Sequence, residues 1–193
     1  MDSVAVFCGS SLGVDEKIVK EATELGKFMA AQNIMLIYGG ARVGLMGKIA
    51  DGALQNGGKV IGVIPTFLKS KEIFHQGLTE LIVVETMHER KTKMHEISDG
   101  FIALPGGFGT LEELFEIVTW AQLGLHKKPI GILNVNGFFE AMFQFLDNMV
   151  SKGFLKLENR EMILQSESYQ DLLEQMKSYS PKHVTKWIEK EQT

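Results

Sequence analysis

The residue types best suited to chemistry lie close together in residues 104–113, where glycines precede a threonine and a pair of glutamates. Glycine allows the backbone to approach a ligand closely and to adopt positive φ, so this composition predicts a loop whose amides can face an anion. A helix that begins near Thr110 would add its dipole and its unpaired N–H groups to the same site. The segment therefore predicts a phosphate-binding loop that leads into a helix carrying carboxylates.

A second interpretation of this segment needs no ligand. Thr110 and Glu113 have the spacing of a capping box, in which each side chain accepts a hydrogen bond from the other residue's backbone amide. The sequence supports both interpretations equally. Two better-known nucleotide motifs do not fit, because Gly47-Lys48 is not followed by Ser or Thr and Gly107-Phe-Gly109 lacks the third glycine of a dinucleotide fingerprint.

Charged residues both follow and precede the glycine segment. Glu112, Glu113 and Glu116 lie on the polar side of the predicted helix, and none has a basic residue four positions later. Before the segment, Arg90 and Lys91 belong to a basic helix that directly follows a predicted strand. An arginine there could hold a phosphate or a carboxylate through its planar guanidinium. Solvated surface faces are the ordinary alternative for such charges, but the unpartnered carboxylates favour a catalytic face.

The other reactive side chains predict neither a metal centre nor a covalent nucleophile. The only cysteine, Cys8, has no histidine pattern beside it, so we expect a packed thiol. His88 and His95 stand seven residues apart, which is not a zinc-binding spacing. We therefore expect no metal and no cofactor.

These residues must be positioned by an alternation of short strands and helices. Apolar runs predict strands near residues 3–8, 34–38, 59–64, 81–85, 101–104 and 130–133, with a weaker one near 162–164. Apolar residues at helical spacing predict helices near residues 18–29, 45–55, 87–98, 110–123 and 138–150. Continuous apolar strands that alternate with helices are typical of a parallel sheet covered on both faces. We predict an α/β fold, a Rossmann-like doubly wound sheet.

In such sheets, ligands bind beyond the carboxyl ends of the strands, near the switch in strand order. Glycine clusters follow three predicted strands, at Gly9-Ser10, Gly39-Gly40 and Gly106-Gly107. One cluster alone would indicate an ordinary turn, but three at one edge of the sheet predict a shared site. Residues 65–80 lack clear periodicity, and we expect them to form a flap over this site.

Length, composition and charge limit the remaining possibilities. The 193 residues, 45% of them hydrophobic, predict one globular domain over residues 1–193, with the last helices (about 168–193) packing at its periphery. The net charge of −4 disfavours a nucleic-acid groove, which requires a basic face. No apolar run is long enough to span a membrane, and the first residues lack the features of a signal peptide. With a single cysteine, these features predict a cytoplasmic protein.

Four segments together resemble a known enzyme family. In chain order, Cys8-Gly-Ser-Ser11, Tyr38-Gly-Gly40, Met87-His-Glu-Arg-Lys91 and Pro105-Gly-Gly-Phe-Gly-Thr-Leu-Glu-Glu113 resemble the Lonely Guy (LOG) family of cytokinin riboside 5′-monophosphate phosphoribohydrolases, long mislabelled as lysine decarboxylases. The resemblance runs from about residue 3 into the C-terminal third of the chain. It implies hydrolysis of the N-glycosidic bond of a nucleoside 5′-monophosphate by a homodimer whose sites lie near the subunit interface.

The resemblance also implies roles for individual residues. Arg90 and Glu113 match the family's catalytic positions. The positions that we expect to contact substrate are Ser10, Gly39, Gly40, Glu72, Met87, Arg90, Lys91, Gly106, Gly107, Phe108, Gly109, Thr110, Leu111, Glu112, Glu113 and Thr119. Of these, Glu72 rests on the loosest match, because residues 69–74 resemble the family's flap only weakly.

Two alternatives to catalysis remain. Related Rossmann-like proteins carry nucleotides or molybdenum cofactor without turnover, and an interaction protein could retain a vestigial site. The presence of both Arg90 and Glu113 argues against the carrier, and the intact glycine loop argues against the vestigial site. The sequence does not distinguish AMP from an N6-modified AMP as the substrate.

Overall fold

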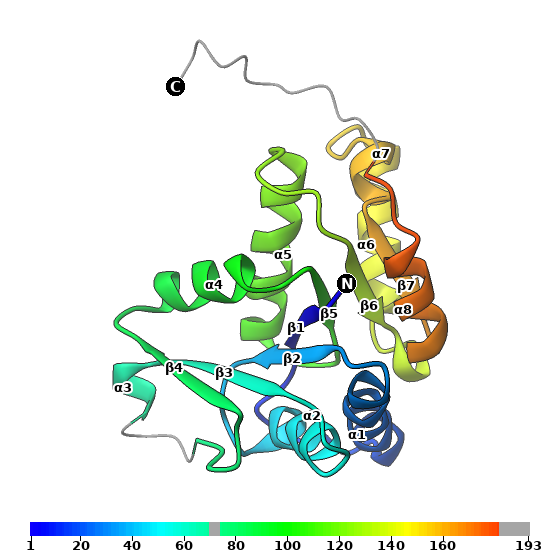
Figure 1. Ribbon diagram of the computed structural model, residues 1–193. Helices are drawn as coiled ribbons and strands as arrows, with labels where there is room; N and C mark the ends of the chain where they lie inside the picture. The colour runs from blue at the N-terminus through cyan, green and yellow to red at the C-terminus, as the bar shows by residue number, and fades with distance from the viewer. Residues whose placement is uncertain (70–73, 182–193) are drawn as a thin grey trace.

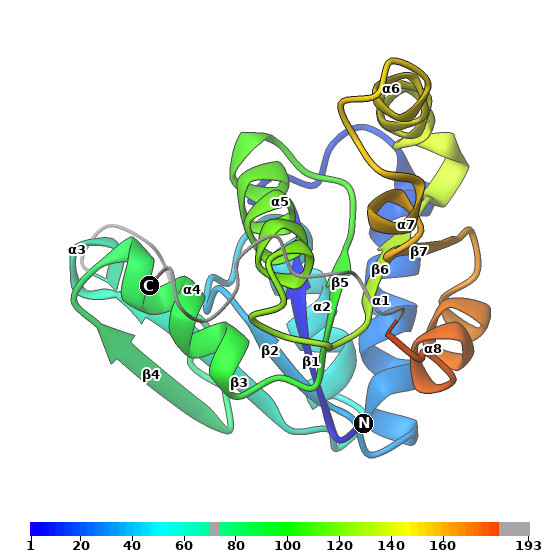
Figure 2. The same cartoon turned by 90° about the horizontal axis from the view of Figure 1, so that it is seen from above.

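The computed structural model describes residues 1–69 and 74–181, and a single parallel sheet runs through them (Figure 1). Its seven strands lie in the order β4-β3-β2-β1-β5-β6-β7. They are β1 (Ser3–Phe7), β2 (Met35–Tyr38), β3 (Val60–Pro65), β4 (Glu80–Val84), β5 (Gly100–Ala103), β6 (Ile130–Leu133) and β7 (Ile163–Ser166). Every predicted strand is present, including the weak last one, which forms the edge next to β6. Figure 2 shows β4 at one side of the sheet and β7 toward the other.

Helices cover both faces of this sheet. They are α1 (Glu16–Ala31), α2 (Gly44–Leu54), α3 (Thr66–Lys69), α4 (Met87–Glu96), α5 (Phe108–Gln122), α6 (Glu140–Ser151), α7 (Leu157–Arg160) and α8 (Tyr169–Lys177), with a 3₁₀ turn η1 (Val135–Gly137). In Figure 1, α1 and α2 lie on one side of the central strands, and α4 and α5 lie on the other.

Alternate side chains of β1 enter two separate cores, which explains why its whole run is apolar. Val4 and Val6 pack with α1, α2 and α8, whereas Ala5 and Phe7 pack with α4, α5 and α6. The prediction of a doubly wound, Rossmann-like α/β fold is therefore confirmed. The extent of the domain stays a prediction, since α8 is the one helix described within the predicted terminal region.

The order of the strands places β1 beside β5, and the helices that follow them lie on opposite faces. Their carboxyl ends bring the glycine clusters together. The Gly9 amide donates to the Pro105 carbonyl at 3.1 Å, and the Leu45 amide donates to the Gly9 carbonyl at 3.1 Å. This is the switch point where ligands bind in doubly wound sheets.

The predicted flap, residues 65–80, is structured near both of its ends. Its first residues form α3, a single helical turn. Its returning part is anchored, because the His75 amide donates to the Gly40 carbonyl at 3.0 Å and the His75 ring lies 3.0 Å from an Asp51 carboxylate oxygen. Glu72 lies outside the described residues. Among the helices that are described, none combines the length and apolar composition needed to cross a bilayer.

Candidate active site

The start of α5 decides between the two interpretations of the glycine segment. The helix begins at Phe108, its N-cap is Gly107, and no side chain caps it. Thr110 lies inside the first turn and is buried. Its hydroxyl packs against Gly106, where an added Cβ would lie 2.1 Å from the Thr110 oxygen. The capping-box interpretation is therefore wrong, because the helix starts two residues earlier than the sequence suggested.

The consequence is a set of amides at the helix start that point to no protein acceptor. Leu111 donates to the Gly107 carbonyl, but within residues 1–69 and 74–181 no acceptor lies in hydrogen-bond range of the Phe108, Gly109 and Thr110 amides. Gly107, Phe108 and Gly109 are exposed. Such a helix end is suited to bind an anion through its N–H groups and its dipole.

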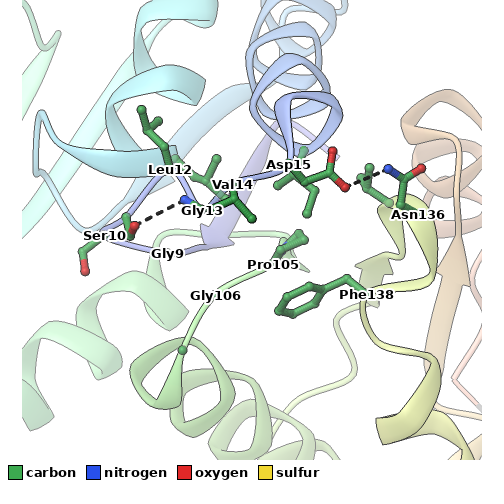
Figure 3. A pocket seen from close by; sticks show the side chains of 15 residues that line it. Gly9, Ser10, Leu12, Gly13, Val14, Asp15, Pro105, Gly106, Asn136 and Phe138 are labelled. Carbon is green, nitrogen blue, oxygen red and sulfur yellow. Dashed lines mark hydrogen bonds between the residues drawn. The ribbon is translucent and has the colours of Figure 1, made fainter.

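A cavity of about 520 Å³ adjoins this loop. It is bounded by the segment after β1, by Pro105–Gly107 and by the segment after β6, as Figure 3 shows. Much of its lining is apolar, from Leu12, Val14, Ile18, Leu45, Val135 and Phe138. Ser10, a polar residue that we predicted to contact substrate, also lines this cavity. Arg90 and Glu113 are not among its lining residues.

Two segments of the cavity rim are held together by a hydrogen bond that the sequence did not reveal. Asn136 donates to the Asp15 carboxylate at 2.8 Å (Figure 3). Its side-chain oxygen also accepts from the Lys17 ammonium at 2.9 Å. Asn136 has a φ of 52°, a left-handed conformation that asparagine tolerates better than most residues. These contacts join the start of α1 to the turn after β6.

The predicted catalytic residues form a buried ion pair between α4 and α5. A guanidinium nitrogen of Arg90 lies 3.2 Å from a Glu113 carboxylate oxygen, and the two side chains are 11% and 10% exposed. The guanidinium packs directly on Gly39, where an added Cβ would lie 2.4 Å from its nitrogen. Met87 supports it through a long sulfur contact of 3.9 Å. Gly39 and Met87 therefore help to place Arg90.

Burial and the charge of Arg90 act on the pKa of Glu113 in opposite directions. Burial raises the pKa of the Glu113 carboxyl above its ordinary value, and the Arg90 charge opposes this rise. Cys8 lies close enough to interact with both groups. Burial, aided by the Glu113 charge, raises the pKa of the Cys8 thiol well above its usual range. The prediction that Cys8 is a packed thiol is confirmed.

Lys91, which the family resemblance places against substrate, faces the carboxylates of α5. Its ammonium donates to Glu112 and, at 3.0 Å, to Glu116, and the residue is only 6% exposed. The carboxylates that lack a basic partner on their own helix thus find one on α4. Sequence reasoning missed this contact because it joins residues 21 and 25 positions apart.

The remaining residues that we predicted to contact substrate are more dispersed. Gly40, with a φ of 82°, packs on Gly62 and Leu81 and belongs to the turn after β2. Thr119 is exposed, and its hydroxyl donates to the Phe115 carbonyl at 2.6 Å. It lies on the same side of α5 as Glu112 and Glu116.

Comparison with known proteins gives consistent matches. A family model described as "Possible lysine decarboxylase" matches residues 46–176. A probable cytokinin riboside 5′-monophosphate phosphoribohydrolase of Oryza sativa subsp. japonica is 48% identical over 181 residues, which cover 93% of this chain and 74% of that protein. A cytokinin riboside 5′-monophosphate phosphoribohydrolase of Arabidopsis thaliana is 45% identical over 180 residues, 93% of this chain and 84% of that protein.

Among solved structures, the molybdenum cofactor binding protein of Rippkaea orientalis has a TM-score of 0.69. It is 24% identical, and the match covers 91% of this chain and 95% of that one. At this level of identity, the similarity supports the fold alone.

Proposed function

The chain belongs to the Lonely Guy (LOG) family of cytokinin riboside 5′-monophosphate phosphoribohydrolases, and we propose that it hydrolyses the N-glycosidic bond of a nucleoside 5′-monophosphate. The products are the free base and ribose 5-phosphate. One observation carries this proposal, namely that Glu113, which is buried and paired with Arg90 of α4, lies on the helix whose first amides are free to bind a phosphate.

The 5′-phosphate binds at the start of α5. The amides of Phe108, Gly109 and Thr110 donate to its oxygens, and the helix dipole stabilises its charge. Glycines at 107 and 109 leave the approach to these amides open, since nothing lies within 4 Å of the position of an added Cβ. The phosphate fixes the ribose relative to Glu113, which lies one turn further along the helix.

Loss of a base from C1′ creates oxocarbenium character on the sugar, and a carboxylate is the usual stabiliser of such a charge. Glu113 stabilises this cation and orients the attacking water. The water oxygen bonds to C1′ as the C1′–N bond breaks. The proton that the water loses balances the proton that the departing base takes up. Arg90 orients Glu113, and its buried Nε–H has no acceptor among the described residues.

The test is a panel of nucleoside 5′-monophosphates and their nucleosides, with released base as the readout. We expect kcat/KM for monophosphates to exceed that for the matching nucleosides by about 10²-fold or more, the value of two or three charge-assisted hydrogen bonds. Including AMP and N6-alkylated AMP in the panel identifies the preferred base. Equal activity on nucleosides would contradict the assignment of the phosphate site.

A carrier that binds nucleotide or molybdenum cofactor without turnover is the weaker alternative. Its support is the solved structures that share the fold at 22–24% identity. The relatives named as phosphoribohydrolases are 43–48% identical. Tight binding with no release of base from any monophosphate would favour the carrier.

Lysine decarboxylation, which the name of the family model suggests, has little support from the lysines. That reaction with pyridoxal phosphate requires a lysine amine that can form a Schiff base. Lys91 is the one buried lysine among the described residues, and both of its partners are carboxylates. An amine held in this way is not placed as a nucleophile.

We also propose that the protein is a cytoplasmic homodimer. Exposed apolar side chains lie along α5 and just after it, with Phe108 93%, Leu123 50% and Leu125 65% exposed. A partner subunit that covers them would also shield the neighbouring site from water. A free, buried Cys8 fits a reducing compartment. Light scattering should give twice the mass of one chain, and a monomer at concentrations that support activity would contradict the dimer.

A further inference from the structure

We propose that Lys91 is a positioning residue that neutralises Glu112 and Glu116 and so leaves Arg90 paired with Glu113 alone. This inference rests on the proposed function, in which Glu113 acts as a carboxylate. It goes beyond what the family resemblance implies, because it gives Lys91 a role toward the enzyme's own carboxylates.

The charges at the α4–α5 contact are unbalanced. Two consecutive cations of α4, Arg90 and Lys91, face three carboxylates of α5. The Lys91 side chain is 7% exposed, so its ammonium requires partners to offset the loss of water. Glu112 and Glu116 supply both of them. Without Lys91, one guanidinium would face three negative charges.

Helix geometry explains why the two cations have different partners. Glu112 and Glu116 are four residues apart and lie on one side of α5, so one ammonium reaches both. Glu113 is rotated by about 100° from Glu112, toward the buried side. Arg90 and Lys91 differ by the same rotation on α4. Arg90, packed on Gly39, meets Glu113, and Lys91 meets the outer pair. A point-like ammonium suits two separate carboxylates, whereas the planar guanidinium suits one.

The titratable and charged groups that face Glu113 come from three parts of the fold. The neutral Cys8 thiol lies just after β1, Arg90 and Lys91 come from α4, and Glu112 and Glu116 come from α5 itself. Glu112 and Glu116 raise the pKa of Glu113, and Lys91 lowers it. Removing Lys91 would therefore favour the protonated, inactive form of Glu113, and would offer Arg90 two competing carboxylates.

The test is the pH dependence of kcat/KM in a Lys91→Met variant, which keeps the apolar length of the side chain. We expect the acidic limb of this pH profile to move to higher pH by about one unit or more, because Glu112 and Glu116 would then act on Glu113 without the opposing charge of Lys91. The triple variant Lys91→Met/Glu112→Gln/Glu116→Gln removes the repulsion together with the cation, so the limb should return toward its original position. Lys93→Met, which removes a surface cation of α4 paired with Glu96, is the matched control and should leave the limb in place.

Other outcomes overturn the inference. A Lys91→Met variant with an unmoved limb and a KM raised only for phosphorylated substrates would show direct contact with phosphate. A lowered melting temperature with an unmoved limb would show a purely structural link between helices. If Lys91→Met does not fold, the double variant Glu112→Gln/Glu116→Gln serves instead. Its acidic limb should move to lower pH, because Lys91 then acts on Glu113 without the opposing charges of Glu112 and Glu116. Failure of the proposed function would differ, since the unmodified protein would then release no base at any pH.

Discussion

Replacing Glu113 with glutamine is expected to lower kcat by about 10³-fold, within the range for removal of a positioned catalytic carboxylate. Glutamine has nearly the same volume and can still accept a hydrogen bond from Arg90, but it lacks the negative charge that stabilises an oxocarbenium ion. Because we propose that the phosphate binds to backbone amides at the start of α5, we expect KM to change much less than kcat. Steady-state release of base from the preferred monophosphate measures both constants.

The variant must also remain folded for this result to be informative. Arg90 is 11% exposed, and the loss of its charged partner should reduce stability by about 1–3 kcal/mol, the cost of a weakened buried pair. Thermal unfolding measures that loss separately. Glu174→Gln is the matched control, because Glu174 is an exposed carboxylate of α8 paired with Lys177. Full activity in Glu113→Gln would remove Glu113 from the mechanism.

The pH profile gives a second readout of the same residue. Burial raises the pKa of Glu113 above 4.5, its ordinary value. A group that acts as a carboxylate loses activity when the pH falls through its pKa, so the acidic limb of kcat/KM should lie above pH 4.5. The residual activity of Glu113→Gln should lack this limb. A limb that persists unchanged in the variant would assign the titration to another group.

Hydrophobic patterns predicted the fold because each strand or helix carries its own pattern within a short stretch of sequence. Strands such as β1 and β6 are uninterrupted apolar runs, and parallel strands buried on both faces require this composition. The convergence of glycine turns followed from the same reasoning, since carboxyl ends of parallel strands meet at one edge. The contact between Gly9 and Pro105 confirms this for the turns after β1 and β5.

The start of α5 shows where local reasoning fails. The spacing of Thr110 and Glu113 satisfied a capping pattern, yet close packing of Thr110 against Gly106 draws Thr110 into the first turn. The pairing of Glu113 with Arg90 and of Lys91 with Glu112 depends on how α4 lies against α5. Such contacts join residues more than twenty positions apart and leave no periodic signal in the sequence. For Arg90 and Glu113, it was the family resemblance that singled out the pair.

Arg90→Lys is expected to lower kcat/KM by about 10²-fold, comparable to the loss of one well-placed donor in an active site. The charge is retained, so the acidic limb should stay near its original pH. The planar guanidinium that packs on Gly39 and contacts Glu113 is lost. An ammonium on a different stem cannot make these contacts together.

Arg90→Met separates the charge of the arginine from its geometry. Glu113 would remain buried without its nearest cation, so its pKa should rise further and the acidic limb should move to higher pH. Arg90→Lys and Arg90→Met should therefore differ in the position of the limb, while both show low activity at its plateau. Lys93→Met again provides the surface control on α4. If both Arg90 variants kept full activity above the limb, Arg90 would only link α4 to α5, and the orientation of Glu113 would have to come from α5 alone.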